Sequence, residues 1–304
     1  MAVYFLNLKT FGRSNGSSAV SAAAYRSGER IHDDRTGKTY DHSDRLDVMH
    51  KEIVLPTRFS NDDLSWARER ASLWNLAEAA ETRKNARVAR EYLIALPAEL
   101  AAGQRVGLVQ EFSRELSDRY GFALDVSIHA PRDFPGSDPR NFHAHLLATT
   151  RTVTMDGLGG KTTLEMQDAR RRELGLAPAI YELLHVRERW ASTANQALAD
   201  AGLSARIDHR TLAAQGIDRE PRPNIPKAAF EMERQGYRSA LAERLREEYR
   251  ARVEARAMGK TQSLEDMRRE ARENWHRLRQ SQGRSGDLPP AAPSDRTRDD
   301  DLAQ

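Results

Sequence analysis

The stretch Asn141-Phe142-His143-Ala144-His145-Leu146-Leu147-Ala148-Thr149-Thr150-Arg151 decides the fold of this chain. Apolar and β-branched residues dominate its second half, which predicts a β-strand. Side chains two residues apart on a strand share one face, so His143 and His145 would present two imidazoles side by side. Residues 124–129 alternate apolar and polar side chains and predict a second strand, which ends on His129.

The segment between these two predicted strands indicates how they pair. Residues 130–140 contain Pro131, Pro135 and Pro139 and are too few for a crossover helix. This connection favours an antiparallel pair. Together with the helical patterns elsewhere in the chain, it predicts an α+β fold with a central, mainly antiparallel sheet flanked by helices, rather than a doubly wound parallel sheet.

If the two strands pair, three imidazoles converge. His129, His143 and His145 would then hold one divalent metal ion, because histidine is the commonest metal ligand and three protein ligands leave coordination positions open for a substrate. The chain has nine histidines in all, so three of them within residues 129–145 form a local cluster in the sequence. The alternative is that His143 and His145 are simply half-exposed polar residues.

Composition narrows the class of protein. The 304-residue chain contains no cysteine, which excludes disulfides, thiolate zinc sites and cysteine nucleophiles and fits a reducing compartment. No apolar run approaches the roughly 20 residues of a membrane span, and no signal sequence is evident, so we expect a cytoplasmic protein without membrane contact. The 48 Lys and Arg against 45 Asp and Glu give a net charge of only +3, yet many cations are arginines, which suit phosphate recognition.

The remaining patterns predict the other elements and three parts of the chain. Strands are expected over residues 2–8 and 87–96, and helices up to Arg26 and over 62–84 and 99–120, the first capped by Ser17 or Ser18. The predicted parts are a main domain over residues 1–227, a charged helical extension over 228–282 and a disordered tail over 283–304.

Tyr25 is the residue that gives the predicted metal site a possible reaction. It lies in Ser21-Ala22-Ala23-Ala24-Tyr25-Arg26, where small neighbours leave its phenol uncovered. A phenol oxygen next to a metal that polarises a phosphodiester is suited to attack phosphorus and form a covalent phosphotyrosine. The alternative for Tyr25 is a structural role in packing.

Several motifs, in this order, resemble the MobA/MobL (MobQ-type) conjugative relaxases over roughly residues 2–225. The motifs are Ala-Val-Tyr-Phe-Leu-Asn-Leu-Lys-Thr at 2–10, Ala-Ala-Ala-Tyr-Arg at 22–26, Trp-Asn at 74–75, Glu-Ala-Ala-Glu at 78–81, Lys-Asn at 84–85, Arg-Glu at 90–91, Ala-Leu-Pro at 95–97, Asn-Phe-His-Ala-His at 141–145, Arg-Ile-Asp-His-Arg at 206–210 and Gln-Gly-Ile at 215–217. Each motif alone is weak, and their combination is specific.

The resemblance implies a tyrosine HUH endonuclease, in which a histidine cluster binds a divalent ion and a tyrosine nicks single-stranded DNA. It implies that Tyr25 is the nucleophile and that His129, His143 and His145 hold the metal, with Mg²⁺ or Mn²⁺ as the expected ion. Glu91 matches an acidic position of the family near the active site. Relatives often carry a second acid two residues later, where this chain has Leu93, so the role of Glu91 stays open between general base and orienter of a metal histidine.

The same resemblance implies the reaction and the partners. The chain would nick plasmid DNA at an origin of transfer, stay joined to the 5′ end, accompany that strand to a recipient cell and rejoin it there. The implied partners are single-stranded origin DNA, a type IV secretion coupling protein and accessory mobilisation proteins. Two alternatives remain open: a rolling-circle replication initiator or transposase of the HUH class, and a non-catalytic DNA-binding module.

Basic residues near these motifs are candidates for DNA contact, because a DNA channel needs cations along the phosphate path. The alternative for each is a solvated or structural side chain. The candidates are Arg13, Arg26, Arg83, Lys84, His209 and Arg210.

Overall fold

The computed structural model of the protein describes residues 2–132 and 137–282, and among these residues six strands form one antiparallel sheet. The order across the sheet is β1 (Leu6–Gly12), β5 (Arg87–Ala95), β7 (His143–Thr154), β6 (Phe122–His129) and β4 (Val48–Val54), and β8 (Gly157–Lys161) pairs with the end of β7. A separate hairpin joins β2 (Arg30–Asp33) to β3 (Lys38–Asp41). The predicted α+β fold with a mainly antiparallel sheet is confirmed.

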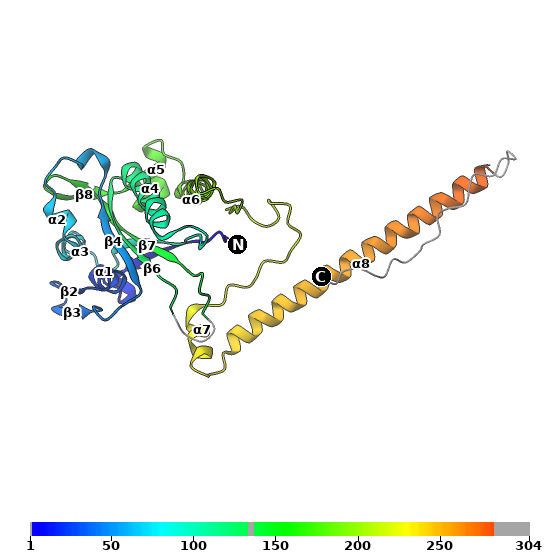
Figure 1. Cartoon of the computed structure of the whole chain (residues 1–304), viewed down its shortest axis with the longest axis horizontal. Coiled ribbons are helices and arrows are strands. Elements are labelled where there is room, and N and C mark those ends of the chain that lie inside the picture. The colour runs from blue at the N-terminus through cyan, green and yellow to red at the C-terminus, as the bar shows by residue number, and fades with distance from the viewer. Residues whose placement is uncertain (1, 133–136, 283–304) are drawn as a thin grey trace. The chain divides into compact units, whose positions relative to one another are not determined.

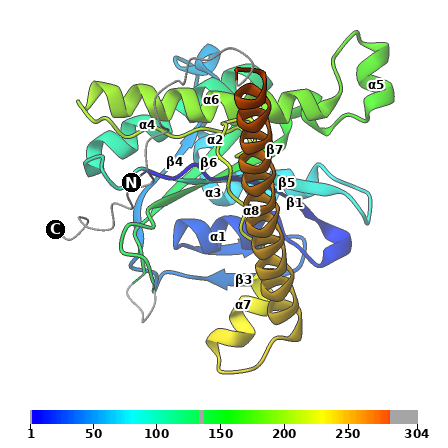
Figure 2. The same cartoon turned by 90° about the vertical axis from the view of Figure 1, so that its right-hand side faces the viewer.

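Helices cover both faces of the sheet, as Figure 2 shows for α4 (Ala102–Tyr120) and α6 (Ala179–Asp200) on one side and α1 (Ala19–Ser27) on the other. The α1 face also carries α2 (Ser65–Arg68) and α3 (Arg70–Ala79), whose buried residues pack in the same core. The remaining short elements are η1 (Arg13–Asn15), η2 (Thr57–Phe59), η3 (Thr163–Glu165) and α5 (Asp168–Glu173).

Alternation along β7 divides its side chains between two cores. Leu146 and Ala148 belong to the core beneath α4 and α6, whereas Leu147 belongs to the core beneath α1 and α3. Because side chains of odd-numbered residues in this strand share the face of Leu147, His143 and His145 point toward the α1 side. The sheet is therefore packed on both faces, and polar groups on the α1 side lie in a largely buried setting.

Helix α1 is fixed at both ends by local chemistry. Ser18 is its N-cap and accepts a hydrogen bond from the backbone N–H of Ser21, as one of the two predicted caps should. Gly28 ends the helix with φ 62°, a left-handed conformation that favours glycine, and a Cβ there would lie 3.2 Å from the side chain of Val48. The helix therefore ends at a defined point, Ser27, two residues after Tyr25.

Two predicted elements differ in their bounds. The first strand begins at Leu6 rather than at residue 2. The helix predicted over residues 62–84 is two helices, because Glu69 adopts an extended conformation and its carboxylate caps the N–H groups of Ala71 and Ser72 at the start of α3. The apolar periodicity predicts one continuous helix here, whereas capping by Glu69 divides it into α2 and α3.

The chain divides into two compact units, Met1–Arg210 and Thr211–Gln304, and Figure 1 labels their elements along the chain. The predicted division is at residue 227, and the predicted disordered tail, 283–304, lies outside the described residues. In the second unit, α7 (Lys227–Arg234) precedes the 43-residue α8 (Ala240–Gln282). Exposed ion pairs join Asp218 to Arg256 and Lys260 along this helix.

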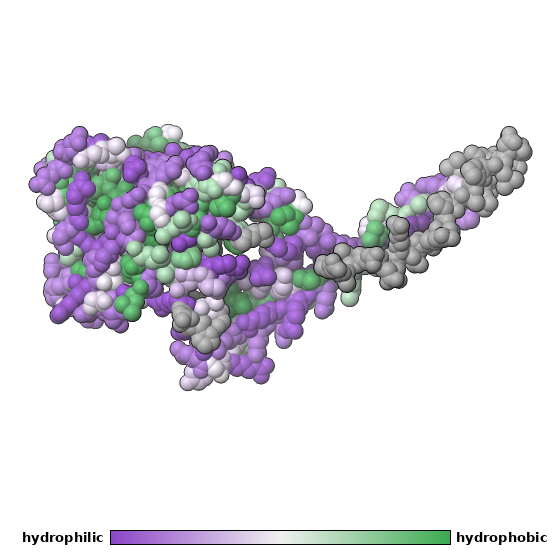
Figure 3. All heavy atoms as spheres, in the orientation of Figure 1, coloured by the Kyte–Doolittle hydropathy of each residue, from purple (hydrophilic) through white to green (hydrophobic). Residues whose placement is uncertain are grey.

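The surface in view is mostly hydrophilic, with scattered hydrophobic side chains (Figure 3). Among the described residues, no helix combines the length and the apolar character that crossing a membrane requires.

Candidate metal centre and its tyrosine

Strand register brings the three predicted histidines together. His129, at the end of β6, is the direct partner of His143 on β7, and Ser127 is the partner of His145. One ligand atom from each of the three histidines lies within 4.8 Å of the others. The ring centroids are 4.8 Å apart for His129 and His145 and 5.3 Å apart for the other two pairs. The cluster expected from the sequence spacing therefore forms.

Each ring uses one nitrogen to contact a fixed acceptor. His129 Nε2 lies 2.7 Å from the carbonyl oxygen of Arg26, and His143 Nδ1 lies 2.9 Å from that of Asn141. His145 Nδ1 lies 2.6 Å from Glu91 Oε1. If these nitrogens carry the protons, the other nitrogen of each ring keeps its lone pair, as a metal ligand requires.

Electrostatics keep the three rings neutral. Burial lowers the pKa of His143 and of His145 below the ordinary value of 6.5, and it lowers the pKa of His129 to about 3. Only the neutral imidazole can donate a lone pair to a metal. Three neutral, converging imidazoles whose outer nitrogens have acceptors are a donor set that fits a divalent cation.

Glu91 supports this cluster from β5. It is 4% exposed, and its Oε1 accepts hydrogen bonds from His145 Nδ1 and, at 2.5 Å, from Arg26 Nε. Burial alone would raise the pKa of Glu91, but the hydrogen bonds from His145 and Arg26 lower it to about 2. Glu91 is thus a carboxylate at neutral pH, held between a candidate metal ligand and α1.

Tyr25 is exposed on α1 while Ala24 and Arg26 on either side of it are buried. The residue is 38% exposed, as the alanine-rich sequence predicts. The next residue, Arg26, is tied to the cluster twice, through its carbonyl to His129 and through its guanidinium to Glu91. The backbone next to Tyr25 is therefore hydrogen-bonded to the histidine cluster through Arg26.

A group of three charged residues around Tyr25, namely Arg45, Asp47 and Arg132, is not predicted from the sequence. Asp47 accepts hydrogen bonds from Arg45 and Arg132, which both also contact Tyr25. Arg45 Nη2 also lies 3.3 Å from His129 Nδ1, the nitrogen left for a metal. These three residues come from loops, where no periodicity marks them, and the one signal in the sequence is the position of Arg132 shortly after His129.

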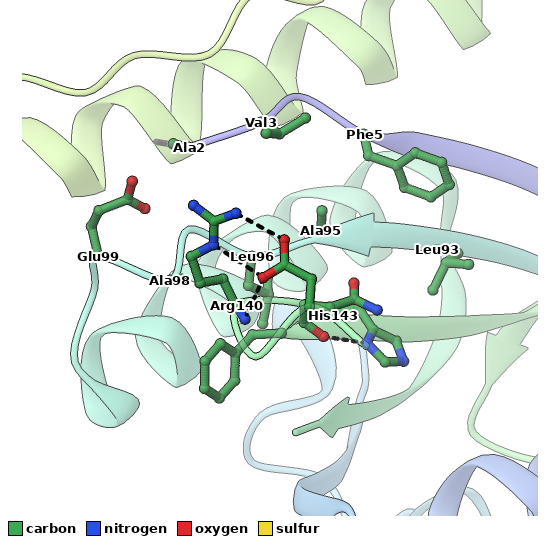
Figure 4. Close-up of a pocket in the computed structure, with 13 residues that line it drawn as sticks. Ala2, Val3, Phe5, Leu93, Ala95, Leu96, Ala98, Glu99, Arg140 and His143 are labelled. Atoms are coloured by element: carbon green, nitrogen blue, oxygen red, sulfur yellow. Dashed lines mark hydrogen bonds and ion pairs between the residues drawn. The ribbon is translucent and has the colours of Figure 1, made fainter. Parts of the chain in front are cut away.

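Two other residues on this face are not part of the cluster. Asp125, which shares the His129 face of β6, accepts hydrogen bonds from Arg70 Nε and Trp74 Nε1, both at 2.8 Å, and so serves the packing of α3. Leu93 contributes no carboxylate and lines an apolar pocket of about 470 Å³. Figure 4 shows Phe5, Leu93 and His143 around this pocket, which adjoins the cluster through His143.

The predicted DNA contacts differ in their exposure and in their partners within the protein. The Arg13 guanidinium donates to the Glu78 carboxylate at 2.8 Å, and that of Arg26 is bound to Glu91, so both have structural partners. Arg83 and Lys84 are exposed on the loop between α3 and β5. His209 lies edge-on to Tyr4 with ring centroids 6.4 Å apart, and Arg210 is exposed and paired with Asp208 at 2.7 Å. These six remain predictions as DNA contacts.

The fold and the site thus define an α+β protein with a three-histidine candidate metal centre beside an exposed tyrosine. The sequence profile of the MobA/MobL family matches residues 17–235, and the chain belongs to this family. The resemblance stated from the motifs is therefore confirmed.

The chain is also similar in sequence to individual mobilization proteins of bacteria. Mobilization protein MobL of Acidithiobacillus ferridurans is 39% identical over 255 residues, which cover 77% of this chain and 64% of that protein. Mobilization protein A of Escherichia coli is 35% identical over 254 residues, covering 80% of this chain and 32% of that protein. The chain therefore spans less than two thirds of the length of these relatives.

One solved structure also matches well. It is described as "Molecular Basis of Vancomycin Resistance Transfer in Staphylococcus aureus", with a TM-score of 0.55 and 28% sequence identity, and the match covers 69% of this chain and 100% of that one.

Proposed function

We propose that this chain is a plasmid mobilisation relaxase, which nicks one strand of DNA at an origin of transfer through a tyrosine and later rejoins it. The observation that carries the proposal is the hydrogen bond between His129 Nε2 and the carbonyl of Arg26. It fixes a candidate metal ligand against the residue that follows the exposed Tyr25. Membership of the MobA/MobL family supports the same conclusion.

The proposed metal ligands are His129, His143 and His145, with Mg²⁺ or Mn²⁺ as the ion. A divalent ion held by three ligands with open positions supplies Lewis-acid polarisation of the scissile phosphate. The lowered pKa values of the histidines support this assignment, because the protein does not have to remove protons from these rings at neutral pH.

Tyr25 is proposed as the nucleophile. Its phenolic oxygen loses a proton to solvent and bonds to phosphorus, while the bond from phosphorus to the 3′-oxygen breaks and that oxygen takes up a proton. The product is a 5′-phosphotyrosyl strand and a free 3′-hydroxyl. Attack by a 3′-hydroxyl on this ester reverses the step and rejoins the strand, so the bond energy is conserved throughout.

Glu91 is proposed as the orienter of His145 rather than as a general base. A carboxylate with a pKa of about 2 is a poor proton acceptor at neutral pH. Its short contacts to His145 and Arg26 instead support a positioning role, in which Glu91 fixes the orientation of a metal ligand relative to α1.

The proposed substrate, partners and location are those that the resemblance to the conjugative relaxases implies. The substrate is single-stranded origin DNA in the bacterial cytoplasm, and Arg83, Lys84, His209 and Arg210 are proposed contacts to it. A type IV secretion coupling protein and accessory mobilisation proteins are the proposed partners, and the covalent complex would enter the recipient cell.

Oligonucleotides that span the origin of the plasmid that carries this gene test the proposal. Incubation with Mn²⁺ should give a shortened strand and a protein–DNA adduct, and excess EDTA should abolish both. A double-stranded replication origin cut in preference would instead identify a replication initiator. DNA binding without any adduct would instead identify the protein as a non-catalytic DNA-binding module.

A further inference from the structure

Tyr25 is held by two arginines that share one carboxylate. Arg132 Nη2 donates a hydrogen bond to the phenolic oxygen of Tyr25 at 3.2 Å. The Arg45 guanidinium lies 4.4 Å from the centroid of the Tyr25 ring and also donates to the Tyr25 backbone carbonyl. Asp47 binds Arg45 at 2.6 Å and Arg132 at 3.1 Å.

These contacts restrain a side chain that is otherwise exposed. Arg45 lies against the ring face, His42 meets the ring edge-on with centroids 5.2 Å apart, and Arg132 binds the oxygen. A cation over an aromatic ring is attracted to the ring face, so the arrangement limits the rotamers of Tyr25 without burying it. Tyr25 remains 38% exposed, and its hydroxyl oxygen lies against the Arg132 guanidinium.

The carboxylate of Asp47 makes the arrangement stable. Burial would raise the pKa of Asp47, but hydrogen bonds from Arg45 and Arg132 hold it well below the ordinary value, so Asp47 is ionised at neutral pH. An ionised carboxylate binds a guanidinium in a fixed geometry, and it orients Arg132 even though the side chain of Arg132 is 51% exposed.

We propose that Arg132 is a further catalytic residue of the Tyr25 reaction and that Asp47 is the residue that positions it. The inference rests on the proposed function. During nicking the phenol oxygen carries developing negative charge as its proton leaves, and during rejoining the same oxygen leaves phosphorus as an anion. A guanidinium N–H already directed at this oxygen stabilises the charge in both directions.

An ordinary phosphate contact is the competing explanation for Arg132, and a kinetic experiment on the full-length protein separates the two. Single-turnover adduct formation is measured with Mn²⁺ and saturating origin oligonucleotide, and DNA affinity is measured separately in a Tyr25→Phe background. The variants are Arg132→Gln and Arg132→Lys. The matched control is Arg170→Gln, which removes an exposed arginine of the same unit whose partner is Glu173.

We expect Arg132→Gln to slow adduct formation at saturation by roughly 100-fold, the lower end of the cost of removing one preorganised donor from a developing charge. Its DNA affinity should change no more than that of Arg170→Gln. Arg132→Lys should recover part of the rate, because a cationic donor remains. Asp47→Asn should slow the reaction in the same direction and add little to Arg132→Gln, because both changes remove one function.

The contrary results are distinct. A weaker affinity with an unchanged rate at saturation would make Arg132 a phosphate contact, and equal rates for Arg132→Gln and Arg170→Gln would give it no role. Either outcome overturns this inference alone. Absence of any adduct with the unaltered protein would overturn the proposed function, and this inference with it.

Discussion

A buried carboxylate, Glu91, shows at the scale of single residues how this site is held together. Its Oε1 accepts from both His145 and Arg26, so one oxygen couples the sheet to the helix that carries Tyr25. The sequence alone leaves Glu91 open between general base and orienter. The lowered pKa and the two short contacts favour the orienter, a distinction that depends on distances no sequence pattern contains.

Replacing Glu91 by Gln tests this role. The variant should bind Mn²⁺ roughly 10- to 100-fold more weakly, because His145 loses the charged acceptor that orients it. Its free energy of unfolding should fall by about 3 kcal/mol, because the Arg26 guanidinium stays buried without its ion-pair partner. Calorimetric titration with Mn²⁺ and urea unfolding provide the two measurements.

Glu81→Gln is the control for that experiment. Glu81 is also buried and pairs with Arg151 and Lys161 at 2.8 and 2.7 Å. Its replacement should lower stability and leave Mn²⁺ affinity unchanged. Equal Mn²⁺ affinity in both variants would contradict the role given to Glu91.

The histidine cluster predicts a pH dependence of stability for the metal-free protein. The pKa of His129 is about 3 in the folded chain and 6.5 as the ordinary value, so below pH 6.5 the unfolded chain binds a proton that the folded chain does not. Stability therefore falls as the pH drops from 6.5 toward 3. For His129 the loss between pH 7 and pH 5 is about 2 kcal/mol.

Urea unfolding at these two pH values measures this loss. His129→Asn should reduce the dependence, because it removes the group whose pKa differs between the folded and the unfolded chain. A free energy of unfolding that is the same at pH 7 and pH 5 would show that the cluster is not buried in the neutral form.

At the scale of elements, the sequence is most informative where a pattern is local. Alternation in residues 124–129 and the His-x-His spacing indicate the strand faces, and a short connection with prolines indicates the antiparallel pairing. These local patterns are sufficient to predict that the three histidines converge. Ser18 is recognisable as a cap for the same reason, because its partner, Ser21, is three residues away.

Two features that the sequence does not predict correctly have different causes. One is a local cap that continuous apolar periodicity conceals, and the other depends on contacts between distant residues. Apolar periodicity runs through residues 62–84, but Glu69 caps a new helix and the helix ends at Ala79. Arg45, Asp47 and Arg132 carry no pattern that would select them, since they meet only when the loop before β4 lies against the loop after β6. The network that positions the proposed nucleophile is therefore a property of the tertiary structure.

At the scale of the whole molecule, we expect the first unit to carry the nicking reaction and the second unit to add non-specific affinity for DNA. A chain that ends after Lys227 should nick a short oligonucleotide at the full rate, because the sheet, the histidines and Tyr25 all lie within Met1–Arg210. It should bind long DNA more weakly and with a shallower salt dependence, since each lost phosphate contact reduces the log–log slope by roughly one unit. Binding of long DNA as a function of salt is the measurement.

Two results would contradict these roles of the two units. Unchanged affinity and slope would mean that α8, despite its arginines, only extends the chain. Loss of nicking would mean that residues beyond Lys227 are required for the reaction itself.

The central claim is that the Tyr25 oxygen, beside the histidine cluster, forms a covalent bond to DNA, and trapping that bond tests it most directly. The protein is incubated with Mn²⁺ and a single-stranded origin oligonucleotide, the adduct is digested, and the modified peptide is identified by mass spectrometry. We predict that the nucleotide lies on Tyr25 and that Tyr25→Phe gives no adduct while it still binds the uncleaved strand. An adduct on another residue, or one that persists in Tyr25→Phe, would contradict the account.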